Sequence, residues 1–224
     1  MSQRLIGIDL DGTLEDSRAD MVAAARKVRA ALGLPVRADA QLAPWVNAGM
    51  DRLYRACFDD YLAAGDEGTR YAAVREAYEA EYLAHVADET RLYAGIAAAL
   101  EQLAKLGSLA CVTNKPERIS IALLDALGVG RLFGAVIGGD TCTEAKPSPL
   151  MLAAAAERCG FDRARGQAFM IGDTAGDIQL GRAYGATTIW CAWGYAAEPG
   201  DVPDFRVSEP GELAAMVGRG RGYA

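Results

Sequence analysis

Two aspartates one residue apart follow a short apolar run near the start of the chain. Asp9 and Asp11 stand in the stretch Asp-Leu-Asp-Gly-Thr-Leu, directly after the apolar residues 5–8. Because side chains alternate along a strand, both carboxylates can share a face if the strand continues, and Gly12 permits a tight turn around a small ligand. Such a pair suits a metal ion and a phosphate, with one carboxylate attacking and the other moving protons. A calcium-loop fragment or a plain acidic turn are the alternatives.

A hydroxyl and an amide side chain follow a second apolar run. Thr113 and Asn114 come after residues 109–112 and just before a helical stretch that begins at Pro116. Both side chains could donate hydrogen bonds to phosphate oxygens at the helix N-terminus, where the helix dipole favours an anion. The alternative is that one of them caps the helix. The sequence alone assigns no role to the next residue, Lys115.

A lysine and a second pair of acids occur in two further loops. Lys146 lies in a proline-rich loop that leads into a helical stretch. A single lysine is usually a solvated surface charge, so Lys146 is a candidate site residue only in combination with the other motifs. Asp173 and Asp177 follow the apolar residues 168–171, and their spacing brings them to one side of a helix, where they could hold a hard cation. Helix capping is the alternative interpretation.

Five short apolar runs predict strands that position these residues, and each run ends at polar residues or glycine. Helical patterns alternate with the strands, and several begin at proline and end at glycine. This alternation predicts a Rossmann-like α/β core, a doubly wound parallel sheet with helices on both faces. The predicted strands are residues 5–8, 109–112, 135–137, 168–171 and 187–191, and the predicted helices are 96–106, 116–127, 149–159 and 177–184.

One long segment breaks this alternation. From residue 17 to about residue 90 no strand is predicted, and we expect an all-α cap domain inserted after the first strand. Residues 1–16 and 91–224 would then form the α/β core. Because residues 17–90 leave the core just after Asp9 and Asp11, the cap could cover that loop as a lid. The helical stretches predicted in the insert are 21–32, 42–46, 52–63 and 71–86.

The composition limits the classes of protein to which the chain can belong. Its 224 residues are 51% hydrophobic, enough for a sizeable core in one large domain or in one domain with an insert. The net charge of −7 argues against a nucleic-acid surface, which needs clustered Lys and Arg. No apolar run approaches the roughly 20 residues of a membrane span, and no secretion signal is recognised. We expect a cytoplasmic protein, monomeric or weakly homo-oligomeric, whose five scattered cysteines are reduced.

The four motifs resemble those of the haloacid dehalogenase superfamily, in that family's order along the chain. Within it they are similar to the phosphoglycolate phosphatases and their close relatives, whose helical cap is inserted where residues 17–90 lie here. The resemblance spans nearly the whole chain. One departure is Glu15, where the relatives usually carry an apolar residue, and an extra acid there could alter substrate access or preference. The motifs are Asp9-Leu10-Asp11-Gly12-Thr13, Thr113-Asn114, Lys146-Pro147, and Gly172-Asp173 with Asp177.

The resemblance implies a role for each of these residues. Asp9 is expected to be the nucleophile, and Asp11 the general acid and base. Thr113 and Lys146 are expected to bind phosphate, and Asn114 joins them in the expected phosphate-binding group. The expected Mg²⁺ ligands are Asp9, Asp11 through its backbone carbonyl, Asp173 and, in a supporting position, Asp177.

The expected activity is Mg²⁺-dependent hydrolysis of a phosphomonoester through an aspartyl-phosphate intermediate. The expected substrate is a small phosphorylated metabolite, with 2-phosphoglycolate the first choice. Dehalogenation is disfavoured, because dehalogenases of this superfamily generally lack the second aspartate and need no metal. Open alternatives are a phosphatase or a phosphoglucomutase-like phosphotransferase acting on a sugar phosphate, and a pyrophosphatase. A non-catalytic phosphate-binding or receiver-like module is a remote alternative.

Overall fold

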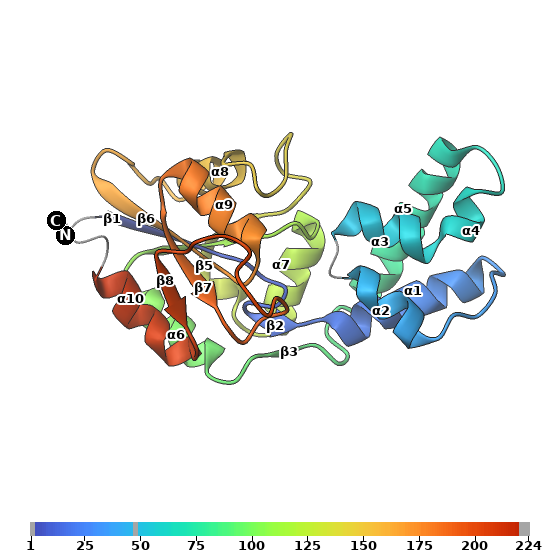
Figure 1. Cartoon of the computed structure of the whole chain (residues 1–224), viewed down its shortest axis with the longest axis horizontal. Helices are drawn as coiled ribbons and strands as arrows, with labels where there is room; N and C mark the ends of the chain where they lie inside the picture. The colour runs from blue at the N-terminus through green and yellow to red at the C-terminus, as the bar shows by residue number, and fades with distance from the viewer. Residues whose placement is uncertain (1–2, 47–48, 220–224) are drawn as a thin grey trace. The chain divides into compact units, whose positions relative to one another are not determined.

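The computed structural model of the protein describes residues 3–46 and 49–219. The chain divides into two compact units, each of which is described by itself. One unit comprises the residues up to 16 together with those from 92 onward, and we call it the core unit. The other comprises residues 17–91, and we call it the cap unit. Figure 1 shows the strands gathered in the core unit and helices α1 to α5 in the cap unit.

The core unit is built on a six-stranded sheet with the strand order β5-β4-β1-β6-β7-β8. Every neighbouring pair in this sheet is parallel. Ile8 at the end of β1 lies opposite both Cys111 of β4 and Ile171 of β6, so the residues that follow these three strands meet at one edge. The strands are β1 (Gln3–Ile8), β4 (Ser108–Val112), β5 (Phe133–Ile137), β6 (Gly166–Gly172), β7 (Thr187–Cys191) and β8 (Phe205–Val207).

Helices cover both faces of the sheet. In Figure 1, α8 and α9 lie above the sheet and α6 and α10 below it, which confirms the predicted doubly wound α/β fold. The 3₁₀ turns η1 (Gly130–Leu132) and η2 (Pro210–Glu212) connect elements of the same unit. The helices are α6 (Ile96–Leu103), α7 (Glu117–Ala126), α8 (Leu150–Arg158), α9 (Ala175–Tyr184) and α10 (Leu213–Arg219).

A hydrophobic cluster between the sheet and α8 fixes the central strand. Leu5 of β1 and Met170 of β6 pack with Met151 and Leu152 of α8, all of them buried. Full burial of each such side chain contributes roughly 1.5–3 kcal/mol. A Cβ at Gly7 would lie 2.7 Å from the Leu152 Cδ1 atom, so glycine lets α8 approach the strand that carries the first motif. Packing at the middle of β1 therefore positions the residues at its end.

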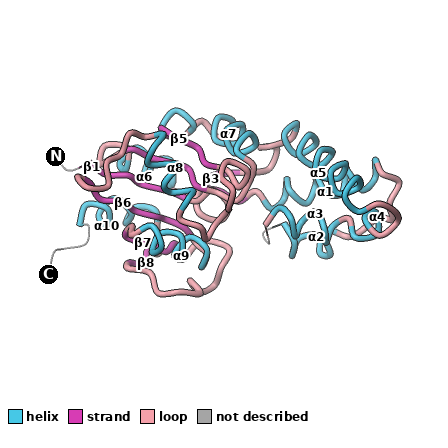
Figure 2. Tube along the Cα trace, turned by 90° about the horizontal axis from the view of Figure 1, so that it is seen from above, coloured by secondary structure: helices cyan, strands magenta, loops and turns pink. Residues whose placement is uncertain are grey.

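In the described residues of the cap unit, the regular structure is helical apart from Arg91, which begins a short strand. Its interior contains the buried Arg29, which forms an ion pair of 2.6 Å with Asp60. The same guanidinium donates hydrogen bonds to the carbonyl oxygens of Cys57 and Pro35, at 2.6 and 2.8 Å. Figure 2 shows the helices of this unit in cyan. They are α1 (Arg18–Ala31), α2 (Asp39–Val46), α3 (Met50–Cys57), α4 (Asp59–Leu62) and α5 (Glu67–Ala84).

Some elements differ from the predictions. The helix predicted at residues 52–63 is two helices, because the backbone leaves the helical region at Phe58, with φ −131°. The strand β8 and the helix α10 were not predicted. Neither were the two short strands β2 (Glu15–Asp16) and β3 (Arg91–Leu92), which pair with one another. Among the described residues, no helix has the length and apolar character needed to cross a membrane.

Candidate active site

Asp9 lies at the carboxyl end of the central strand, in contact with a lysine. Its backbone N–H donates to the Ile171 carbonyl oxygen at 2.9 Å, which continues the pairing of β1 with β6 by one residue. The Nζ atom of Lys146 lies 2.5 Å from Asp9 Oδ1 and 2.8 Å from Asp177 Oδ1. The side chains of all three residues are almost fully buried. The structure thus brings three of the predicted site residues together.

A group of three buried carboxylates could hold a metal ion. One carboxylate oxygen from each of Asp9, Asp173 and Asp177 lies within 4.8 Å of the others. The Thr13 hydroxyl bridges two of them, donating to Asp173 Oδ1 at 3.2 Å and to Asp9 Oδ2 at 3.4 Å. Oxygen-only ligands of this charge fit a hard divalent cation such as Mg²⁺. The residues present therefore satisfy the chemistry of a cation site.

Asp173 is held by β7 and by the loop that follows it. The backbone N–H of Tyr195 donates to Asp173 Oδ2 at 2.6 Å, and the Trp190 indole donates to the Asp173 carbonyl oxygen at 2.8 Å. A Cβ atom at Gly194 would overlap the Asp173 side chain, and one at Gly12 would lie 2.6 Å from Asp173 Oδ2. The two glycines therefore allow the close approach that fixes this carboxylate.

Asp177 serves two purposes in the first turn of α9. Its Oδ2 atom accepts hydrogen bonds from the Thr174 backbone N–H at 3.0 Å and from the Thr174 hydroxyl at 2.7 Å. This is a capping box, and it satisfies the helix terminus. The other oxygen, Oδ1, accepts from Lys146. Capping and membership of the site, which the sequence left as alternatives, are therefore compatible in the same residue.

The electrostatics of the cluster follow from its burial. Burial and the neighbouring Asp177 raise the pKa of Asp9 well above its ordinary value, against the opposing effect of Lys146. Burial and Asp177 also raise the pKa of Asp173. Burial alone would lower the pKa of Lys146, but the carboxylates of Asp177 and Asp9 outweigh it and raise the pKa of the ammonium. Lys146 therefore stays charged, and any further positive charge nearby would stabilise the ionised form of the carboxylates.

Asp11 contacts a different lysine, which the sequence did not single out. Its Oδ1 atom accepts a short hydrogen bond from the Nζ atom of Lys115. The Lys115 side chain is 1% exposed and that of Asp11 is 22% exposed. The sequence position of Lys115 does indicate that it lies near the site, because it directly follows Thr113 and Asn114 at the end of β4.

Thr113 and Asn114 hold the neighbouring loops. The Thr113 hydroxyl is buried and accepts the Lys115 backbone N–H at 3.1 Å. Asn114 Oδ1 accepts the Lys146 backbone N–H at 3.0 Å, which ties the Lys146 loop to the end of β4. These contacts place both residues at the same sheet edge as Asp9. Their expected role as phosphate-binding groups stays a prediction.

Several other residues have defined surroundings. Glu15 is fully buried in β2, and Trp193 donates from its indole to the Thr13 carbonyl oxygen at 3.0 Å. All five cysteines are free thiols. Cys142 packs against the hydrophobic cluster of the core unit. His85 of the cap unit lies 2.8 Å from Asp88.

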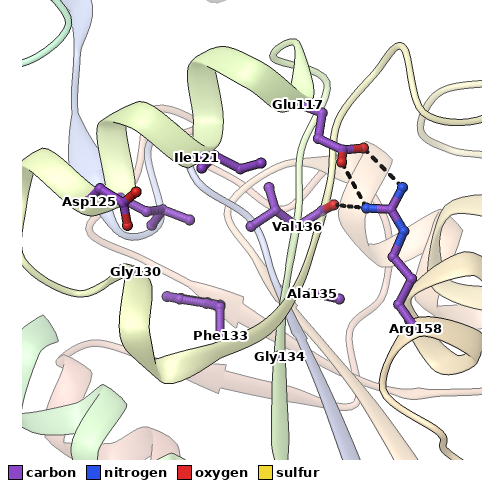
Figure 3. A pocket seen from close by; sticks show the side chains of 10 residues that line it. Glu117, Ile121, Asp125, Gly130, Phe133, Gly134, Ala135, Val136 and Arg158 are labelled. Carbon is purple, nitrogen blue, oxygen red and sulfur yellow. Dashed lines mark hydrogen bonds and ion pairs between the residues drawn. The ribbon is translucent and has the colours of Figure 1, made fainter.

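A cavity of about 310 Å³ lies elsewhere in the core unit, between α7, β5 and the end of α8. In Figure 3, Arg158 is bonded to Glu117 and to the Val136 carbonyl oxygen, with nitrogen–oxygen distances of 2.8 and 2.7 Å. None of the residues that line this cavity belongs to the carboxylate cluster. The carboxylate cluster therefore lies outside this cavity.

Comparison with known proteins agrees with this geometry. Residues 3–185 match the family model of the haloacid dehalogenase-like hydrolases. The chain is 32% identical to the phosphoglycolate phosphatase of Chromobacterium violaceum, over 97% of each chain. It is 33% identical to that of Aquifex aeolicus, over 96% of each chain. The crystal structure of a predicted phosphoglycolate phosphatase from Haemophilus somnus superimposes with a TM-score of 0.79 at 24% identity, covering 96% of this chain and 98% of that one.

The matched residues include all four motifs, and the resemblance inferred from those motifs is confirmed. The solved structure adds the fold, an α/β core with a helical insertion. The chain belongs to the haloacid dehalogenase-like hydrolases, as an enzyme of their phosphatase type.

Proposed function

We propose that the protein hydrolyses 2-phosphoglycolate in a Mg²⁺-dependent reaction that passes through an aspartyl-phosphate on Asp9. The observation that carries the chemistry is the buried Asp9 carboxylate in contact with Lys146 and grouped with two further buried aspartates. The choice of substrate is supported by the relatives, which are named phosphoglycolate phosphatases and align over nearly the whole chain.

The first step must overcome repulsion between like charges. At an effective dielectric constant of about 20, two unit negative charges ~3.5 Å apart repel by about 5 kcal/mol, so a carboxylate cannot approach a phosphate dianion unaided. The ammonium of Lys146 donates a hydrogen bond to Asp9 Oδ1 and offsets part of this repulsion. Asp9, Asp173, Asp177 and the Asp11 backbone carbonyl would hold Mg²⁺. The bound cation would supply further neutralisation and orient the phosphate.

The covalent steps use the two aspartates of the first motif. An Asp9 carboxylate oxygen forms a bond to phosphorus while the bond between phosphorus and the ester oxygen breaks, and Asp11 gives its proton to the departing alkoxide. Asp11 then takes a proton from water as that water attacks the phosphorus atom. The acyl–phosphate bond breaks, and inorganic phosphate leaves with Asp9 restored. Thr113, Asn114 and Lys146 would hold the phosphate oxygens through both steps.

Replacement of the nucleophile tests this proposal. We expect Asp9→Asn to lower kcat for 2-phosphoglycolate by at least about 10⁴-fold, because the amide cannot form the acyl-phosphate. Asp39→Asn is the matched control, since this exposed aspartate of α2 pairs with Arg26 at the surface of the cap unit. Circular dichroism should show the same fold for both variants. Mass spectrometry after acid quench should find a phosphorylated Asp9 in the wild type.

Two results would contradict different parts of the proposal. Turnover of any phosphomonoester near the wild-type rate by Asp9→Asn would exclude Asp9 as the nucleophile. A kcat/KM for 2-phosphoglycolate far below that for a sugar phosphate, in a panel assayed with Mg²⁺, would exclude the substrate and leave the reaction class in place.

A further inference from the structure

The sheet edge of the core unit carries two buried ammonium groups with different partners. Lys146 contacts Asp9 and Asp177, the acids on the side of the phosphoryl group. Lys115 contacts Asp11, the acid that faces the ester oxygen in the proposed reaction. In the proposed reaction, Lys146 would therefore lie toward the phosphoryl group and Lys115 toward the leaving group. The proposed steps give Lys146 a role and give Lys115 none.

The backbone at Lys115 is fixed on both sides. Its N–H donates to the Thr113 hydroxyl at 3.1 Å, and its carbonyl oxygen accepts from the Gly139 N–H at 3.0 Å. A Cβ atom at Gly139 would overlap the Asn114 carbonyl, so this approach of the two loops requires glycine. A lysine whose stem is buried and whose backbone is clamped presents its charge in one place. That is the arrangement expected of a group that recognises a charge on a ligand.

The chemistry of the leaving group brings a charge to this place. In the proposed reaction Asp11 must lie within hydrogen-bonding distance of the ester oxygen. In 2-phosphoglycolate a carboxylate is attached to the same carbon that carries this oxygen. Bound productively, that carboxylate comes next to Asp11, and its negative charge in a partly buried site requires a cation beside it. Once Asp11 has given its proton to the ester oxygen, a second negative charge is present at the same place. The Lys115 ammonium is already in contact with Asp11.

We propose that Lys115 is a specificity-determining residue that binds the carboxylate of the leaving group. The enzyme would then select phosphate esters of small 2-hydroxycarboxylates over esters with neutral leaving groups. This inference rests on the proposed function, in which Asp9 attacks and Asp11 serves the ester oxygen. A different role would be purely structural, with Lys115 serving to hold Asp11 in position, and that role predicts an equal effect on all substrates.

A matched pair of substrates separates these roles. 2-Phosphoglycolate and carbamoylmethyl phosphate have nearly the same shape, but the second carries a neutral amide in place of the carboxylate. For wild type we expect a higher kcat/KM with 2-phosphoglycolate. For Lys115→Met we expect kcat/KM to fall about 10- to 100-fold with 2-phosphoglycolate, mostly through KM, and less than about 3-fold with the amide, the range for one hydrogen bond between charged groups.

Two further variants sharpen the test. Lys115→Gln can still donate a hydrogen bond to Asp11 but has no charge, so we expect the same selective loss, and it replaces Lys115→Met if that variant does not fold. Lys115→Arg restores the charge and should recover part of the preference. Lys105→Met is the control, because it removes an exposed positive charge from the same unit and should change neither kcat/KM.

The outcomes distinguish this inference from the function on which it rests. Equal losses on both substrates in Lys115→Gln overturn the inference and leave Lys115 as a positioning residue. An unchanged preference for the carboxylate in Lys115→Gln also overturns it, while the proposed substrate stands. If wild type shows no preference between the two esters, both the assignment of 2-phosphoglycolate and this inference fail, while the test of Asp9 as nucleophile is unaffected.

Discussion

The buried aspartates of the core unit form a costly arrangement when considered residue by residue. Asp9, Asp173 and Asp177 lie close together with Lys146 in contact with two of them. Moving ionised carboxylates from water into a protein interior costs several kcal/mol each unless they are paired. Raised pKa values at Asp9 and Asp173 are the expression of that cost. Such an arrangement is expected where function, rather than stability, selects the residues.

Proton release on cation binding is the first prediction at this scale. A cation needs the carboxylates of Asp9 and Asp173 in their ionised form. Their raised pKa values keep protons on both groups at pH values above 3.8, the ordinary pKa of an aspartate. We expect Mg²⁺ to bind more tightly as the pH rises through this window and to release protons within it. Isothermal titration calorimetry in buffers with different ionisation enthalpies measures both quantities.

The same shifts fix the sign of their effect on stability. Between the ordinary pKa of 3.8 and the raised value, the folded state holds more protons on Asp9 and Asp173 than the unfolded state does. The contribution of these groups to the free energy of unfolding therefore falls as the pH rises through that window. Asp173→Asn removes one of the two groups and should reduce the released protons. Mg²⁺ affinity that is independent of pH would contradict the prediction.

The four motifs located most of this site because the fold rule places strand ends together. Asp9, Thr113 and Asp173 each follow a strand of a parallel sheet, so their meeting could be predicted without knowing any contact. The contact between Lys115 and Asp11 could not be predicted in this way. It depends on where a long flexible side chain ends, and sequence spacing carries no information on that.

At the scale of elements, the loop after β7 controls one side chain of the candidate metal site. Gly194 lies against Asp173, and the next residue, Tyr195, donates its N–H to Asp173 Oδ2. The Tyr195 hydroxyl donates to Asp16 Oδ1 at 3.2 Å, and burial raises the pKa of this tyrosine, so the hydroxyl stays protonated. The backbone N–H and the side-chain hydroxyl of Tyr195 therefore both hold the loop in place. Its backbone sets the position of Asp173.

Adding a single methyl group at this loop tests its role. We expect Gly194→Ala to weaken Mg²⁺ binding by about 10-fold or more, because the new Cβ overlaps the Asp173 side chain, which must move. Gly211→Ala is the control, since a Cβ there would meet no atom within 4 Å. Calorimetric titration with Mg²⁺ and electron paramagnetic resonance of bound Mn²⁺ report the affinity without an activity assay. Equal affinities in the two variants would show that the loop does not position Asp173.

The elements that sequence patterns missed have physical reasons in common. β2 and β3 have two residues each, and β8 has three, so no alternation of apolar and polar residues can develop in them. The break at Phe58 interrupts an otherwise continuous helical pattern without glycine or proline. The long helix α5 was predicted from its helical spacing. The central strands were predicted as short apolar runs, because a parallel strand covered on both faces is apolar at consecutive residues.

At the scale of the whole molecule, the candidate cation site joins segments that are far apart along the chain. Asp9 follows the first strand, whereas Asp173 and Asp177 lie more than 160 residues later, after β6 and in α9. A ligand that binds these three carboxylates in the folded state, and not in the unfolded chain, stabilises the core unit by mass action. The acidic net charge of −7 also attracts cations without any specific site.

Metal-linked stability is therefore the prediction that belongs to the whole molecule. At a Mg²⁺ concentration about 100 times Kd, the linkage amounts to about 2.7 kcal/mol, or roughly 5–10 °C in Tm for a chain of this length. Differential scanning calorimetry at constant ionic strength measures the shift, and Asp173→Asn should abolish it. An equal shift in Asp173→Asn would mean that Mg²⁺ acts through the acidic surface. Because constant ionic strength leaves non-specific screening unchanged, a shift confined to the wild type requires the three buried carboxylates to act together.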